Sequence, residues 1–348
     1  MSRPSNETRK SMLGHRKDSE ANSSVDPVLV SIALCTYNGA KYLAEQLDSL
    51  LAQTYRDIEI IASDDASTDG TIAILNDYAR RDSRIKVFAH PDNVGLTRNF
   101  QRALLLCNGA FIAPCDQDDI WLPEKISKLI DALGNRVLAY CDSEFVDEKR
   151  NPLGKKMSEM VWMVSTDDPM PFAFANCVSG HAMLFRREVL QHGVPVPPNF
   201  FYDWWLATVA AAMGGVVYHD EPLVSYRQHA TNITDTLGRR DADRLPRGHS
   251  IRFLDETLVR LEAIAAVPGK HGKFAAKISR LWRAREKQWI SLRLGLLMVR
   301  NRDRLFCISR TRRRTVRRQC KQYFYGLRIK RLTNPYEYIM TDAPKPEA

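Results

Sequence analysis

The chain has 348 residues, of which 44% are hydrophobic, and a formal net charge of +10. At roughly 150 residues per domain, this length predicts one large domain or two, with enough apolar residues for a sizeable core. The positive charge favours anionic partners such as nucleic acid, acidic lipid head groups or phosphate-bearing substrates. Seven cysteines are scattered without zinc-ligand spacing, which argues against a zinc-binding module and favours a reducing compartment.

The first 27 residues are polar and lack the apolar stretch of a signal peptide, so we expect a disordered tail there. No apolar run reaches the ~18 residues that a membrane-spanning helix needs. The nearest approach is the segment 289–299, which is short and contains Arg293. These features predict a cytoplasmic protein, either free or peripheral to a membrane.

Short apolar runs alternate with amphipathic segments along the next hundred residues. We predict strands over 28–34, 58–62, 85–88 and 109–113, and helices over 41–53, 71–80 and 99–107. Such alternation indicates βαβ units and a mostly parallel α/β sheet. Ligands bind such sheets outside the carboxyl ends of the strands. We therefore expect the polar loops that follow the strands to converge on one site. These loops are 35–39, 63–70, 90–98 and 116–119.

The pattern is weaker after residue 128. It predicts a strand over 137–140, an irregular segment over 147–170, and strand or short helix signals over 178–187 and 216–227. From about residue 250 the chain becomes helical and basic. Between Arg280 and Arg331, 18 residues are Lys or Arg and only two are acidic. We expect a catalytic domain over 28–240 and a basic helical region over 241–348.

An acidic cluster, Asp116-Gln117-Asp118-Asp119, follows the fourth predicted strand. Three carboxylates within four residues repel one another, and a divalent cation such as Mg²⁺ or Mn²⁺ would offset that repulsion. A solvated acidic turn that caps the helix after Pro123 explains the same residues equally well. The position after an apolar strand favours the metal.

Other polar segments leave two interpretations open. The acids of segment 63–70 suit the polar groups of a nucleoside, and Thr68 or Asp69 suits a helix cap. Arg98, near the start of a helix, could bind a phosphate or could be an ordinary surface arginine. Asp203 lies among aromatic residues, where burial would raise its pKa and suit it to general-base work, or it caps the helix 204–213. His229 suits a metal, a phosphate or a structural role.

The basic C-terminal helices carry several large apolar residues among their arginines. Such helices can lie on an anionic membrane, pack on the catalytic domain with a solvated face, or bind nucleic acid. No nucleic-acid recognition module is present, so we expect no nucleic-acid partner. The apolar residues in question are Trp282, Trp289, Leu292, Leu294, Leu296, Leu297 and Met298.

Taken together, the motifs resemble the family 2 glycosyltransferases with the GT-A fold, and in particular rhamnosyltransferase-like enzymes of bacterial surface polysaccharide synthesis. The resemblance covers roughly residues 28–235. Its motifs, in chain order, are the segments 30–39, 64–71, 93–95, 116–121, 202–205 and 226–229.

The resemblance implies a role for each matching residue. Thr36, Tyr37 and Asn38 would line the nucleotide pocket, Asp65 would contact the base, and Asp203 would be the catalytic base. The acidic cluster would serve metal and diphosphate, with Asp118 the more direct ligand and Asp119 a helix cap. The remaining implied contacts are His229 and Asp116 to metal, Asp116, Gln117, Arg98, Arg227 and Asn232 to substrate, and segment 179–183 to the acceptor.

The implied reaction is an inverting transfer that depends on Mg²⁺ or Mn²⁺. The donor would be dTDP-L-rhamnose or a UDP-sugar, and the acceptor a saccharide or lipid-linked saccharide at the inner face of the cytoplasmic membrane. A nucleotidyltransferase acting on sugar phosphates is the alternative, although residues 35–39 are not the Gly-rich phosphate loop that such an enzyme normally needs.

Overall fold

The computed structural model describes residues 28–197, 200–230, 232, 249–267, 270–308, 320 and 322–325. The expected polar tail over 1–27 lies outside these residues. Strands and helices alternate through the first third of the chain, as the sequence predicted. The strands are β1 Val30–Thr36, β2 Ile58–Asp64, β3 Ile85–Ala89, β4 Phe111–Cys115, β5 Ile120–Trp121, β6 Leu138–Val146, β7 Pro152–Lys156, β8 Met183–Arg186 and β9 Val216–Arg227.

The α-helices fall into two groups along the chain. Those between the strands are α1 Leu43–Leu51, α2 Thr71–Arg81, α3 Leu96–Leu106, α4 Lys125–Leu133, α5 Met157–Met160, α6 Leu190–Gly193 and α7 Tyr202–Met213. Those after the last strand are α8 His249–Ala266, α9 Lys270–Ala284, α10 Leu292–Arg300 and α11 Arg302–Leu305. Short 3-10 turns include η1 Met170–Ala173, η2 Gly180–Ala182 and η6 Gln322–Phe324.

The strands of the described residues form one nine-stranded mixed sheet, in the order β3-β2-β1-β4-β8-β6-β9-β5, with β7 added on β6. The pairs β3-β2, β2-β1 and β1-β4 are parallel. Beyond β4 the direction reverses at β8, which runs antiparallel to both its neighbours. The parallel half therefore places the carboxyl ends of β1, β2 and β4 side by side.

Alternate residues of β1 point to opposite faces of the sheet and pack into two different cores, because successive side chains of a strand alternate in direction. Ile32 and Leu34 pack with α1, α2 and α4 on one face of the sheet. Ala33 and Cys35 pack with α3 and α7 on the other. A strand buried on both faces is apolar throughout, which is why the sequence showed a continuous run rather than alternation.

The region beyond β4 departs from the prediction in detail. The strand expected over 137–140 continues to Val146, and segment 216–227 is a single strand. The segment 147–170, expected to be irregular, contains β7 and α5. Strand β7 is exposed along most of its length, so it has no apolar pattern that the sequence could reveal.

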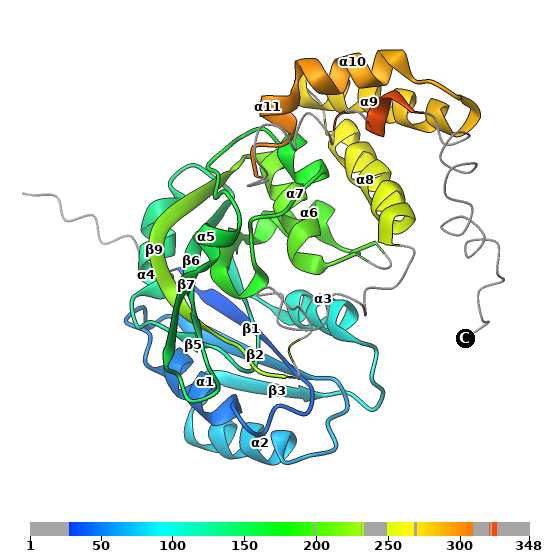
Figure 1. Ribbon diagram of the computed structural model, residues 1–348. Coiled ribbons are helices and arrows are strands. Elements are labelled where there is room, and N and C mark those ends of the chain that lie inside the picture. The colour runs from blue at the N-terminus through cyan, green and yellow to red at the C-terminus, as the bar shows by residue number, and fades with distance from the viewer. Residues whose placement is uncertain are drawn as a thin grey trace, which may run out of the picture.

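The C-terminal helices form a third core together with η1 of the preceding region (Figure 1). Trp282 of α9 contacts Phe174, and Arg260 of α8 lies over the ring of Trp204 in α7. The helices are therefore joined to the sheet-containing part by buried contacts. None of the helices among the described residues is both long and apolar enough to cross a bilayer.

Candidate functional site

The predicted convergence of strand-end loops is present as a cavity of about 860 Å³. One wall comes from residues after β1, β2 and β4 and from the start of α3. The rest of the lining comes from the segment 176–181, the start of α7 and the residues after β9. The polar residues that line the cavity include Thr36, Tyr37, Asn38, Asp65, Asp116, Gln117, Asp118, His181, Asp203, His229 and Asn232.

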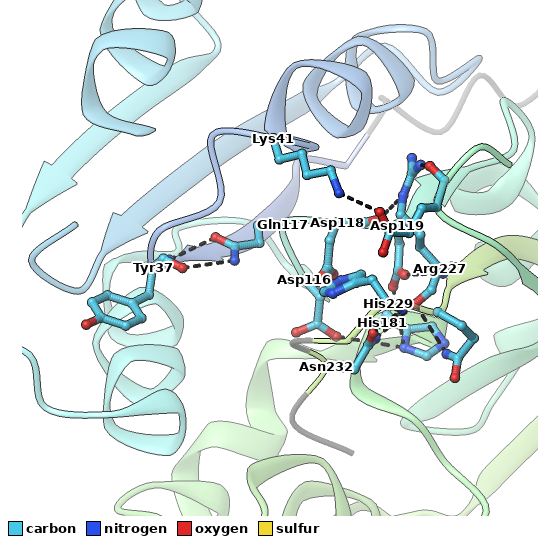
Figure 2. A network of polar contacts seen from close by, with 12 residues as sticks. Tyr37, Lys41, Asp116, Gln117, Asp118, Asp119, His181, Arg227, His229 and Asn232 are labelled. Atoms are coloured by element: carbon cyan, nitrogen blue, oxygen red, sulfur yellow. Dashed lines mark hydrogen bonds and ion pairs between the residues drawn. The ribbon is translucent and has the colours of Figure 1, made fainter. Parts of the chain in front are cut away.

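The loop after β1 is held in place by side chains from neighbouring loops. The Gln117 amide accepts a hydrogen bond from the Tyr37 N–H at 2.8 Å and donates one to the Tyr37 carbonyl at 3.0 Å (Figure 2). A side chain at Gly39 would begin 2.1 Å from Gln117 Oε1 and would displace the Gln117 amide from this position. Both ends of the Gln117 amide are engaged in this way, which makes Gln117 a positioning residue.

Asn38 and Thr36 tie the same loop to the loop after β2. Asn38 has a φ of 48°, a conformation that asparagine tolerates better than most residues, and its Oδ1 accepts the Thr68 N–H at 2.8 Å. Thr36 Oγ1 donates to Asp64 Oδ1 at 2.7 Å. The side chains predicted to meet the nucleotide thus shape the pocket, while Tyr37 is 48% exposed at its edge.

Asp65 is buried where the loop after β2 meets the loop before α3. Its carboxylate accepts hydrogen bonds from the N–H groups of Val94 and Gly95, at 2.9 and 2.8 Å. Gly95 has a φ of 83°, which explains the glycine there. The N-cap residue of α2 is Gly70 and not Thr68 or Asp69, the two expected caps. Asp69 does accept the Thr71 N–H, so it supports the first turn of α2 from outside the helix.

The acidic cluster splits into two acid and histidine groups (Figure 2). Asp118 Oδ2 lies 2.8 Å from His229 Nε2. Asp116 and Asp119 both face Nδ1 of the buried His181, at 3.8 and 3.6 Å. The sequence predicted the first group and did not single out His181, whose only signal was its place just before a strand in the segment 179–183.

Asp119 is a buried acid beneath the site and not the helix cap that the sequence predicted. Helix α4 begins at Lys125 after Glu124, and no side chain caps it. Asp119 Oδ1 accepts the Arg227 N–H at 3.0 Å, and its Oδ2 has no hydrogen-bond partner among the described residues. Burial, together with the charges of Asp118 and Asp116, holds the pKa of Asp119 well above its usual range.

The donor set fits a divalent cation. One ligand atom each from Asp116, Asp119 and His181 lies within 4.8 Å of the others, and the Asp118 and His229 pair stands beside them. Carboxylate oxygens suit Mg²⁺ and Mn²⁺, and a cation would also occupy the unpartnered oxygen of Asp119. Lys125 cannot fully replace that charge, because burial lowers its pKa to about 7 and its Nζ donates to the His181 carbonyl.

Two predicted phosphate or substrate contacts are not at the cavity. Arg98 is exposed on α3 and does not line it. Arg227 is buried under the cluster, where its guanidinium donates to the carbonyls of Asp118 and Glu148 and to the carboxylate of Glu45. Arg227 therefore supports the loop that carries Asp118. Asn232 reaches the cavity, and its amide holds the His229 N–H and the Arg227 carbonyl.

Asp203 lies in the first turn of α7 and lines the same cavity as the acidic cluster. The residue at the helix cap is Phe201, and Asp203 Oδ1 accepts the N–H of Trp204 at 2.6 Å. Burial raises the pKa of Asp203 to about 6, and the charge of Asp116 adds to the rise. The Trp204 and Gly180 backbone groups oppose it. Tyr202, stacked on Phe100 with ring centroids 3.9 Å apart, fixes the start of this helix.

Comparison with known proteins gives the family. Residues 31–194 match the family model described as glycosyl transferase family 2. An uncharacterized glycosyltransferase of Haemophilus influenzae is 25% identical over 253 residues, which cover 69% of this chain and 78% of that protein. An uncharacterized glycosyltransferase of Rickettsia typhi is 36% identical over 60% of this chain and 66% of its own length.

The fold has a solved counterpart. Residues 1–349 of S. aureus TarS, crystallised in complex with UDP-GlcNAc, superpose with a TM-score of 0.55 at 16% identity, over 81% of this chain and 74% of that one. At this identity the likeness concerns the fold. This likeness shows the GT-A fold, and residues 31–194 carry the match to glycosyl transferase family 2.

Proposed function

We propose that the chain transfers a sugar from a nucleoside-diphosphate sugar to a saccharide or lipid-linked acceptor, with inversion at the anomeric carbon, in cell-surface polysaccharide synthesis. One observation carries the proposal. A single cavity is lined by the strand-end loops, by the acid and histidine groups and by Asp203, whose pKa is raised. A donor and an acceptor can therefore meet within one cavity.

The donor belongs on the wall formed by the strand ends. Thr36, Tyr37 and Asp65 line this part of the cavity, which suits a nucleoside, and Asp116 and Asp118 of the acidic cluster line it as well. S. aureus TarS, which shares the fold, has been crystallised with UDP-GlcNAc, and this supports a nucleotide-sugar donor here. Among such donors we favour dTDP-L-rhamnose first and a UDP-sugar second.

The diphosphate belongs beside the acid and histidine groups. A divalent cation, Mg²⁺ or Mn²⁺, bound by Asp118, His229 and Asp116 would offset the charge on the leaving nucleoside diphosphate. His181 faces both Asp116 and Asp119, and the free oxygen of Asp119 could add a ligand to the same cation. Arg227 fixes the Asp118 backbone, so the carboxylates are oriented before any ligand arrives.

Asp203 is the proposed general base. Its carboxylate takes the proton of an acceptor hydroxyl as that oxygen bonds to the anomeric carbon, and the bond from this carbon to the diphosphate oxygen breaks. Attack on the face opposite the leaving group inverts the configuration. A pKa of about 6 leaves Asp203 ionised at neutral pH and makes its carboxylate a stronger base than that of an ordinary aspartate.

We place the acceptor against the apolar part of the cavity lining, next to Asp203. Met157, Val161, Tyr226 and Phe201 give this wall an apolar and aromatic character next to Asp203. Such a surface suits the faces of sugar rings. An acceptor linked to a lipid would place the protein, as a peripheral protein, at the inner face of the cytoplasmic membrane.

A thermal-shift panel tests donor and metal together. Nucleoside diphosphates and their sugars are added to the full chain, each with and without Mn²⁺. We expect one pyrimidine donor to raise Tm by several degrees only when Mn²⁺ is present, because a ligand stabilises the folded state that binds it. Asp118→Asn is expected to lose the shift, whereas Asp131→Asn, an exposed aspartate on α4, keeps it.

The same panel separates the alternative function. A nucleotidyltransferase would be stabilised by a nucleoside triphosphate and by a sugar phosphate, and would respond to the diphosphate sugar only as a product. Stabilisation by triphosphate alone would overturn the proposed transfer. The family match favours glycosyl transfer.

A further inference from the structure

An exposed apolar patch lies at the far end of the molecule from the sheet, on and around α10. Its members are consecutive or near-consecutive in sequence, apart from one residue that follows η6. We call it the α10 patch, and it consists of Trp289, Ile290, Leu292, Leu296 and Tyr325, which are 50%, 58%, 62%, 49% and 49% exposed. Large apolar residues gathered on a surface in this way commonly mark a partner or a membrane.

Helix α10 separates its apolar residues into two faces. At about 100° per residue, Leu292, Leu296, Arg293 and Arg300 fall within one arc of about 100°. Leu294, Gly295 and Met298 fall on the opposite side and are buried in the third core. The buried face accounts for the stability of the helix. The outer leucines, Leu292 and Leu296, are not packed in this core. The stability of the fold therefore does not explain why these positions are apolar.

The patch is built on fixed backbone. The Ser291 N–H donates to the Phe324 carbonyl at 2.7 Å, and Ile290 and Tyr325 form a β-bridge. A Cβ at Gly295 would lie 2.4 Å from the Phe324 ring, so glycine allows this close approach. Trp289, Ile290 and Tyr325 are thereby presented together, beside the outer leucines of α10.

Positive charge surrounds the patch. Lys287, Arg293 and Arg300 are exposed, and none forms an ion pair with another described residue. The segment 287–300 contains no Asp or Glu. Trp, Ile and Leu beside exposed Lys and Arg are typical of an interfacial segment. The apolar side chains of such a segment enter the boundary of a bilayer while the cations meet anionic head groups.

We propose that the α10 patch docks the protein on the surface of an anionic lipid bilayer. This replaces the broader expectation from the sequence, since Trp282, Leu294 and Met298 are buried and only the outer residues of the basic helices are available. A second protein copy would match the apolar residues but would bring the same cations together. The inference accords with the lipid-linked acceptor of the proposed function, and its test needs no turnover.

Vesicle sedimentation of the full chain tests the proposal. Vesicles contain phosphatidylcholine alone or with phosphatidylglycerol, at low salt and at high salt. We expect binding to the anionic vesicles, weakened by salt because part of the attraction is electrostatic. The paired change Leu292→Ser with Leu296→Ser, and separately Arg293→Ser with Arg300→Ser, should each weaken partitioning roughly tenfold or more.

Matched controls come from exposed residues elsewhere. Leu105→Ser on α3, where the leucine is 59% exposed, and Arg56→Ser should leave partitioning unchanged. Circular dichroism and size-exclusion elution report whether each variant is folded and whether the wild type self-associates. Absence of anionic vesicle binding, binding insensitive to the α10 changes, or a dimer that the leucine pair dissolves would each overturn the proposal. None of these outcomes depends on donor binding or transfer.

Discussion

At the level of single residues, three carboxylates of the cavity have different surroundings and therefore different roles. Asp118 is paired with His229, Asp119 is fully buried, and Asp203 is partly buried and lines the cavity. Of these three, Asp203 combines a raised pKa with a place in the cavity lining. Its titration should therefore be visible in the pH dependence of the reaction.

The pH dependence of kcat/KM for transfer tests this assignment. Burial raises the folded pKa of Asp203 to about 6, so the carboxylate is ionised above this pH and protonated below it. Because a base must be ionised, we expect kcat/KM to be level above pH 7 and to fall about tenfold per unit well below pH 6. A profile that stays level down to pH 4.5 would contradict Asp203 as the base.

The sequence predicted well which residues line the cavity. It predicted less well what role each of them has there. Asp116, Asp118, Asp203 and His229 line it, because their motifs follow strands or begin a helix. Arg227 and Gln117 were predicted to contact substrate, but they donate hydrogen bonds to backbone carbonyls. The local sequence does not show which acceptor a side-chain donor will contact in the fold. His181 and Lys125 were missed because their partners lie far away along the chain.

At the level of elements, the loops are positioned by contacts between segments distant in sequence. The boundaries of the first strands and helices were predicted within a few residues, because each has an apolar face with a clear period. The antiparallel strand β8 and the exposed strand β7 were not specified in advance. Strand direction depends on pairing across the sheet, which local periodicity does not encode.

The junction between α8 and α7 gives an element-scale prediction. The guanidinium of Arg260 is buried 3.8 Å above the centre of the Trp204 ring, and it also lies 3.6 Å from Glu256. A desolvated cation and ring pair contributes about 2 kcal/mol. We therefore expect Arg260→Ala to lower the free energy of unfolding in urea by about 2 kcal/mol or more.

Arg283→Ala is the matched control for this measurement. Arg283 pairs with Glu262 within the same group of helices, but both side chains are exposed, at 62% and 37%. Exposed pairs contribute about 0–1 kcal/mol. If both variants lost the same small amount, the contact between α8 and α7 would not be the connection that we describe.

At the level of the whole molecule, the chain combines a GT-A fold with a C-terminal group of helices that shares a core with it. The α/β architecture could be predicted because buried parallel strands have a distinct apolar signature. The packing of the last helices could not, since the sequence did not show which face of each basic helix is covered. Their separation from residues 28–240 as a region of their own stays a prediction.

The most direct test of the account is transfer by the Asp203→Asn variant, measured with the donor that the thermal-shift panel identifies. The carboxamide keeps the shape of the side chain but cannot accept the proton, so we expect transfer to fall by at least about a hundredfold. Donor binding should persist, because in the proposed arrangement the strand-end loops and the acidic cluster hold the donor. Tm at pH 7.5 should not fall, because an acid whose folded pKa is raised destabilises the fold once it is ionised. Near-normal transfer by a folded variant that binds donor would contradict the mechanism.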